Sequence, residues 1–295
     1  MATEPAKTAP LSLREKNMPS STHSIKARAQ ANGKPGANRF HFTYHEILPG
    51  DSDYLYRVSA GAFEEHLAFI SSLKAAPRIS FDDGHRSNYE NAFPILERSR
   101  IKATFFLLAG HVGNNQDYVS WEQAREMSKA GHVVASHGWS HRMLTLCDSP
   151  ELDQELANSK REIEDRIGIE VDAISVPGGR WNERVTEACV LAGYRHFFHS
   201  NPWTPSVEGA NLSVDGRLMI TRHMGASELR TLMSLSPARR SLLRAQFAAK
   251  ESARRLMGER LYHKLWCRLA NWKPEDGMEV QISGPTDKKT GLERS

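Results

Sequence analysis

The sequence predicts an α/β protein whose core is a distorted (β/α) barrel of about seven parallel strands. Strand-like and helix-like segments alternate from about residue 75 to residue 235. That alternation is typical of parallel strands joined by crossover helices. Some strand-like segments are continuous apolar runs, such as "ATFFLLA" at 103–109, as expected for strands buried on both faces. Polar residues follow several of these strands directly, and in such barrels the working residues lie at the C-terminal strand ends.

The first half of the barrel domain is predicted from alternation, apolar spacing and capping residues. Aromatic residues alternate in "FHFTY", which indicates a strand, and a helix follows from the spacing of apolar residues in "AFEEHLAFISSL". A serine before "WEQAREMSKA" and a glycine after it predict the ends of another helix. In chain order, we expect a strand at 40–44, a helix at 61–74, a strand into Asp82, a helix at 89–99 interrupted near Pro94, a strand at 102–110, a helix at 120–131 and a strand at 132–137.

The second half repeats the same alternation. In chain order, we expect a helix at 150–167, a strand at 171–177, a helix at 182–193, strands at 194–200 and 217–223, and a helix at 226–233. About seven strand–helix units favour a barrel over an open sheet. We expect this domain to span residues 39–236.

The flanking segments carry the basic charge of the chain. Residues 1–38 are polar with no apolar period, so we expect a disordered basic tail. Residues 237–273 hold ten basic and two acidic residues and predict a basic amphipathic helical segment. Packing of this helix on the barrel is the favoured interpretation, and peripheral contact with an anionic membrane is the alternative. Residues 274–295 are expected to form a flexible tail.

Composition bounds the location and the partners. We find no apolar run of about 20 residues that could span a bilayer and no apolar segment typical of a secretory signal. Three scattered cysteines favour reduced thiols. We therefore expect a cytoplasmic protein, with peripheral membrane association as the alternative. The domain between the basic flanks is acidic overall, so no nucleic-acid partner is expected, and no protein partner is indicated.

Two adjacent carboxylates end the strand in "RISFDDG", at Asp82 and Asp83. Like charges at a strand end repel each other and lose hydration. A turn is the ordinary explanation, and a bound cation is the functional one. "ASHGWSH" supplies His137 and His141, four residues apart, also directly after a buried strand. Two histidines and one carboxylate leave an open position, as catalytic zinc sites do, so a divalent metal, most simply zinc, is expected, with cobalt, nickel and manganese still open.

These motifs resemble those of the polysaccharide deacetylases, the family 4 carbohydrate esterases. "SFDDG" matches the first family motif, "SHGWSH" the second, and "SVPGGRWN" stands where the third belongs; the resemblance covers about residues 40–235. It implies a metal-dependent hydrolase that removes acetyl groups from N-acetylated sugars. It also implies the residue roles: Asp82 is the general base toward a metal-activated water, Asp83, His137 and His141 bind the metal, and the N–H of Gly178 helps to hold the oxyanion.

The later motifs depart from the family pattern. The usual arginine that tethers the base is replaced by Ser175, so we expect Arg180 or Arg222 to substitute. The strand that usually ends in Leu-His has "MITRHMG" in its place, which makes His223 the candidate general acid, with His199 as second choice. Residues expected to contact substrate are Pro177, Arg180, Trp181 and His199. Two further hypotheses remain open: an amidohydrolase acting on a small non-sugar amide, and a non-catalytic carbohydrate-binding protein.

Overall fold

The computed structural model describes residues 40–50, 53–204, 207–209, 211–258, 261, 262 and 265. The strands are β1 (His41–Tyr44), β2 (Glu46–Leu48), β3 (Arg57–Ser59), β4 (Arg78–Phe81), β5 (Thr104–Leu107), β6 (Val133–Ser136), β7 (Ala173–Ser175), β8 (His196–His199), β9 (Val207–Glu208), β10 (Ser213–Gly216) and β11 (Leu218–Met219). The helices are α2 (Ala60–Ser71), α3 (Phe93–Ser99), α4 (Trp121–Lys129), α5 (Ser149–Asp153), α6 (Ser159–Ile167), α7 (Glu183–Leu191), α8 (Ala226–Met233) and α9 (Pro237–Met257). Two π-helical turns, η1 (Asn88–Ala92) and η3 (Gln154–Asn158), and two 3₁₀ turns, η2 (Leu144–Leu146) and η4 (Pro177–Gly179), complete the set.

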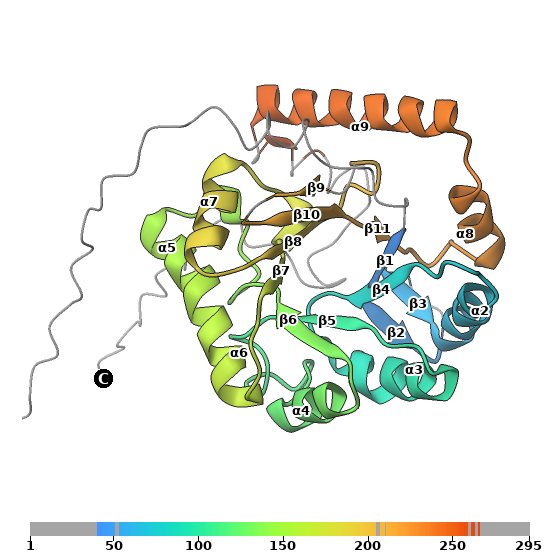
Figure 1. Cartoon of the computed structure of the whole chain (residues 1–295), viewed down its shortest axis with the longest axis horizontal. Helices are drawn as coiled ribbons and strands as arrows, with labels where there is room; N and C mark the ends of the chain where they lie inside the picture. The colour runs from blue at the N-terminus through green and yellow to red at the C-terminus, as the bar shows by residue number, and fades with distance from the viewer. Residues whose placement is uncertain are drawn as a thin grey trace, which may run out of the picture.

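The main sheet closes on itself through a single chain segment. Its order is β11-β1-β4-β5-β6-β7-β8-β10-β9, and its neighbouring strands are parallel except for the β9–β10 pair. Only Arg217 separates β10 from β11 in the chain, yet β10 pairs with β8 and β11 pairs with β1. The segment 213–219 therefore bridges the two sides of the curled sheet, as Figure 1 shows. If β10 and β11 are counted as one strand, the barrel has seven strands, namely β1, β4, β5, β6, β7, β8 and β10–β11. This confirms the predicted fold class.

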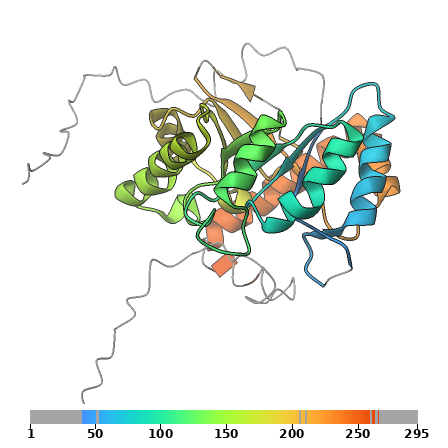
Figure 2. The same ribbon diagram turned by 90° about the horizontal axis from the view of Figure 1, so that it is seen from below.

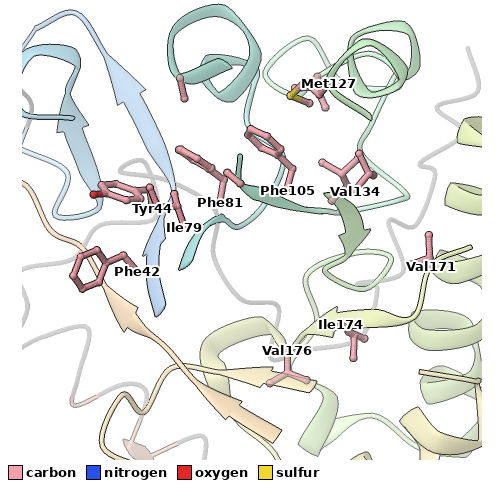
Figure 3. Close-up of a cluster of buried hydrophobic side chains, with 14 of the residues drawn as sticks. Phe42, Tyr44, Ile79, Phe81, Phe105, Met127, Val134, Val171, Ile174 and Val176 are labelled. Atoms are coloured by element: carbon pink, nitrogen blue, oxygen red, sulfur yellow. The ribbon is translucent and has the colours of Figure 1, made fainter. Parts of the chain in front are cut away.

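Side chains alternate between the outside and the inside of the barrel along each strand. Outward residues meet the surrounding helices, and Figure 3 shows part of this buried layer. Tyr44, Phe81 and Phe105 stack across three neighbouring strands, with ring centroids 5.5 and 5.0 Å apart. Each such fully buried side chain contributes roughly 1.5–3 kcal/mol relative to an exposed one. The inward residues Phe106 and Phe198 belong to a separate, small apolar cluster, which leaves room for polar groups inside the barrel.

Helices cover the outside of the barrel (Figure 2). Their ends follow the local sequence signals. Ser120 caps α4 through a capping box with Gln123, as the sequence predicts. Pro94 occupies the first turn of α3, so the predicted helix at 89–99 is divided into η1 and α3. The predicted helix at 150–167 likewise contains the π turn η3 between α5 and α6.

The basic segment after the barrel begins with α9, which runs beside the barrel in Figure 1. Arg244 Nε donates to the carbonyl oxygen of Trp203 at 2.8 Å, and the Arg240 guanidinium lies 5.5 Å from the ring centroid of Phe40. The helix ends at Gly258, where φ is 79°. No helix in the described ranges is long and apolar enough to cross a membrane. The predicted tails at 1–38 and 274–295 and most of 259–273 lie outside the described residues, and the cytoplasmic location and peripheral membrane contact stay predictions.

Candidate active site

The candidate metal ligands follow two strands that lie one strand apart in the barrel. Asp83 comes after β4, and His137 and His141 come after β6. Because the strands are parallel, their C-terminal ends meet at one rim. Asp83 Oδ1 lies 3.2 Å from His137 Nε2 and 3.4 Å from His141 Nε2. All three residues are buried, and one ligand atom from each lies within 4.8 Å of the others, so the structure brings together the three predicted ligands.

The chemistry of this group fits a divalent metal. Asp83 Oδ1 is buried with no hydrogen-bond partner among the described residues. The carbonyl oxygen of Ser175 lies 2.8 Å from His137 Nδ1, which favours a proton on Nδ1 and leaves Nε2 free as a ligand. Burial lowers the pKa of His141 to about 4, although the Asp83 charge opposes this shift, so the imidazole is neutral near pH 7. Burial acts to lower the pKa of His137, but the Asp82 and Asp83 charges outweigh burial and raise it, so metal binding there would release a proton. Two imidazoles and a carboxylate are a typical donor set for zinc.

Backbone conformation at two ligands is unusual for residues that carry a side chain. Asp83 has φ of 75° and His141 has φ of 63°, both in the left-handed region. Such conformations cost roughly 1–3 kcal/mol each and persist only where the surrounding structure holds them. The strain lies at the two residues whose side chains must turn toward each other.

Asp82 faces the barrel interior, where Arg217 binds it with both terminal nitrogens of its guanidinium group. Arg217 Nη1 donates to Asp82 Oδ1 at 2.7 Å, and Nη2 donates to Oδ2 at 2.7 Å. Ser175 Oγ donates to Oδ2 at 3.1 Å. Arg217 is 1% exposed, and its guanidinium lies 4.9 Å from the ring centroid of Phe106. Burial by itself raises the pKa of Asp82, but the Arg217 charge and hydrogen bonds, helped by His137, lower it to about 2.

The prediction that Arg180 or Arg222 tethers the base is therefore wrong. The Arg180 guanidinium lies 5.0 Å from the ring centroid of Tyr262, and Arg222 Nη1 pairs with Asp53 at 3.1 Å. The tether is Arg217, which joins β10, the partner of β8, to β11, the partner of β1. The sequence shows this arginine at the start of an apolar strand, but its inward direction follows only from the strand pairing.

His45 is the histidine that the sequence interpretation left out of the site. It directly follows β1, and its ring stacks on Tyr56 with centroids 5.0 Å apart. The backbone N–H of Asp82 donates at 3.0 Å to the carbonyl of Tyr44, the residue before His45, so His45 and the two aspartates follow neighbouring strand ends. A positive charge on His45 would add to the lowering of the pKa of both Asp82 and Asp83. Its Nδ1 is buried with no hydrogen-bond partner in the described part of the chain.

Two of the remaining predicted site residues lie away from this group. His223 is exposed, and its Nε2 lies 3.1 Å from Arg222 Nε. His199 Nδ1 accepts from the backbone N–H of Asn201 at 3.1 Å, and burial lowers the pKa of His199 to about 4. Because Phe198 points inward, the next residue, His199, points outward. Neither histidine has an interaction with Asp82 or Asp83 in the described ranges.

The loop after β7 holds the other predicted contacts. Trp181 packs against His199, with ring centroids 5.7 Å apart, and thus lies on the outer face with it. Pro177 is buried and Gly178 is exposed, with φ of 64°. A Cβ built on Gly138, in the loop between the two ligand histidines, would lie 3.8 Å from Pro177 Cγ. Pro177 therefore lies beside the loop that joins the two ligand histidines, and the roles of Pro177 and Gly178 stay predictions.

A family model described as polysaccharide deacetylase matches residues 75–197, which include Asp82, Asp83, His137 and His141. Residues 75–197 match the polysaccharide deacetylase family. Relatives include the chitooligosaccharide deacetylase of Rhizobium leguminosarum bv. trifolii, 31% identical over 49% of this chain and 66% of the relative. The peptidoglycan-N-acetylglucosamine deacetylase PgdA of Listeria monocytogenes is 32% identical over 37% of this chain and 22% of the relative. The match spans less than two thirds of the length of each relative.

Two solved deacetylase structures share the fold. The deacetylase PplD of Streptococcus pyogenes, solved with acetate, superposes with a TM-score of 0.60 at 20% identity, covering 68% of this chain and 99% of that one. A de-N-acetylase from Aggregatibacter actinomycetemcomitans gives a TM-score of 0.57 at 20% identity, covering 65% of this chain and 99% of that one. At these identities the likeness supports the barrel fold.

Proposed function

We propose that this chain is a metal-dependent hydrolase that removes acetyl groups from N-acetylated sugars. The observation that carries the proposal is that a buried Asp82 anion, bound by Arg217, and the group of Asp83, His137 and His141 occur together at one rim of the barrel. The names of the relatives support an N-acetylated glycan as substrate. Asp83, His137 and His141 would hold a divalent ion, which would supply a Lewis acid for the acyl oxygen and lower the pKa of a water molecule.

Asp82 is proposed to accept the proton of the attacking water. Its pKa of about 2 keeps the carboxylate ionised at every pH at which the protein would work. The two charged hydrogen bonds from Arg217 fix the plane of the carboxylate and thus the direction of the free lone pairs. A weakly basic carboxylate also holds the proton loosely, so the proton can return to solvent and the base is regenerated.

His45 is proposed to donate a proton to the amine leaving group. An amine leaves as a poor anion unless it is protonated, and imidazole titrates near neutrality. His45 and both aspartates follow neighbouring strand ends, whereas His223 is exposed and pairs with Arg222. Stacking on Tyr56 restricts the orientation of the ring. The acid role predicted for His223 is therefore proposed instead for His45, and the oxyanion role of the Gly178 N–H remains a proposal.

Acetate release from a panel of N-acetylated oligosaccharides tests the proposed reaction. We expect protein reconstituted with Zn²⁺ or Co²⁺ to release acetate from N-acetylglucosamine oligomers, and chelation to stop the release. Hydrolysis of small non-sugar amides, with no release from any sugar, would replace this proposal by an amidohydrolase. Binding of the oligomers with no release under any metal would favour a non-catalytic carbohydrate-binding protein.

A further inference from the structure

Glu155 is a buried residue outside the barrel whose carboxylate accepts hydrogen bonds from the loop between the two ligand histidines. It belongs to the π turn η3 and is 3% exposed. Its Oε2 accepts the backbone N–H of Trp139 at 2.8 Å and that of Ser140 at 3.0 Å. Its Oε1 accepts the Ser140 hydroxyl. Three donors from two adjacent loop residues thus converge on one carboxylate.

The loop is held from the opposite side by the end of β5. The backbone N–H of Ala109 donates to the Gly138 carbonyl at 3.1 Å, and that of Gly110 donates to the Trp139 carbonyl at 2.9 Å. Gly138 has φ of 85°, and a Cβ there would lie 3.0 Å from Glu155 Oε2. The loop backbone therefore passes so close to the carboxylate that a side chain at Gly138 would meet it.

The π turn accounts for how Glu155 reaches the loop. A π turn adds one residue to a helix and locally changes which side chains face inward, and such turns are frequent at functional sites. Ser159 Oγ donates to the Glu155 carbonyl at 2.6 Å and lies 3.0 Å from Ser136 Oγ at the end of β6. The π turn is thus attached to the strand that directly precedes His137.

We propose that Glu155 is a positioning residue that holds the 137–141 loop in the conformation in which His137 and His141 converge on Asp83. The inference rests on the proposed metal site. His141 has a left-handed backbone, which is unfavourable unless neighbouring contacts hold it. Between the two histidines, the side-chain hydrogen bonds at Trp139 and Ser140 come from Glu155. Partners of this kind typically change metal affinity ~10–100-fold when they are removed.

Two conservative variants separate the effect of the length of the Glu155 side chain from the effect of its charge. In Glu155→Gln, the amide oxygen can accept both backbone N–H groups and the amide nitrogen can donate to Ser140 Oγ, so the geometry is kept without the charge. In Glu155→Asp, the charge is kept but the carboxylate is one methylene too short. If hydrogen-bond geometry is what positions the loop, Gln restores metal binding better than Asp does.

Zn²⁺ affinity of the full chain, measured by competition with a chromophoric chelator, provides the test. We expect Glu155→Asp to weaken Zn²⁺ binding ~10-fold or more and Glu155→Gln to stay within about threefold of wild type. Glu162→Gln, a partly exposed position on α6 paired with Arg166, is the matched control and should bind like wild type. The Co²⁺ absorption spectrum should change only in the Asp variant, because only its ligand geometry relaxes.

The outcomes distinguish this inference from the proposed function. Wild-type protein that binds neither Zn²⁺ nor Co²⁺ would overturn the metal site and the inference together. Wild-type binding with an unchanged affinity in Glu155→Asp would overturn the role of Glu155 and leave the metal site standing. Weaker binding in Glu155→Gln than in Glu155→Asp would show that the charge acts rather than the geometry, and would also refute the proposal.

Discussion

Replacing Arg217 by Met should both destabilise the barrel and disable the base. The substitution keeps much of the apolar stem but leaves the Asp82 carboxylate, 4% exposed, without its cation. Removing one partner of a buried ion pair costs about 3–5 kcal/mol. The two 2.7 Å charged hydrogen bonds, at roughly 1.5–3 kcal/mol each, give a cost of the same size. We therefore expect urea unfolding of Arg217→Met to show a loss of about 3–5 kcal/mol.

Arg222→Met is the matched control, because Arg222 lies on the same part of the chain and was one of the two predicted tethers. Its ion pair with Asp53 is exposed, so its loss should cost less than about 1 kcal/mol. Arg217→Lys keeps the charge but loses the two-pronged geometry, and should fall between the two variants. Equal stability of the Arg217→Met and Arg222→Met proteins would refute the assignment of the tether.

The same variants should differ in the pH dependence of acetate release. In wild type, Arg217 and His137 overcome the effect of burial and lower the pKa of Asp82 to about 2. Without Arg217, burial is no longer offset by that cation, so the pKa rises and the base becomes protonated at a higher pH. We expect the acid limb of kcat/KM to move upward in Arg217→Met and to stay in place in Arg222→Met. An acid limb that is unchanged in Arg217→Met would contradict Asp82 as the base.

Three further predictions concern single groups. The pKa of Asp82 is lowered from its ordinary value of 3.8 to about 2, so ionised Asp82 contributes about 2 kcal/mol of stability above pH ~4. This contribution should be lost as the pH falls through about 2. Acid unfolding of Asp82→Asn should lack that pH-dependent loss. His45→Ala should lower kcat ~10²–10⁴-fold with metal content unchanged, and the same loss in His223→Ala instead would return the acid role to His223. Gly138→Ala should cost about 1–2 kcal/mol in thermal unfolding and weaken Zn²⁺ binding, since φ there is 85° and the added methyl group meets Glu155; an unchanged Tm would show that the loop can move away.

Local patterns were enough to predict the barrel and most of the metal group. Strand and helix alternation indicated the order of most elements, two polar motifs at strand ends indicated His137, His141 and one of two aspartates, and the family resemblance assigned Asp83 to the metal. These features depend on residues close together in the sequence. The ends of parallel strands then bring the motifs together without further information.

The features that sequence patterns missed depend on long-range pairing. β10 is short, and no apolar run marks it, so the closing segment 213–219 and the inward direction of Arg217 became visible only with the pairing to β8 and β1. His45 looks like an ordinary strand-end residue until β1 is placed beside β4. The π turn at Glu155 interrupts a segment that has the spacing of one continuous helix.

The two adjacent aspartates offer the most direct test of the account. In the proposed site, Asp83 is a metal ligand, whereas Asp82, which pairs with Arg217, is the base. Metal content by elemental analysis, measured together with acetate release, should show that Asp82→Asn keeps its metal and loses turnover. Asp83→Ala should lose both. A metal-free Asp82→Asn protein beside a metal-loaded Asp83→Ala protein would contradict the account.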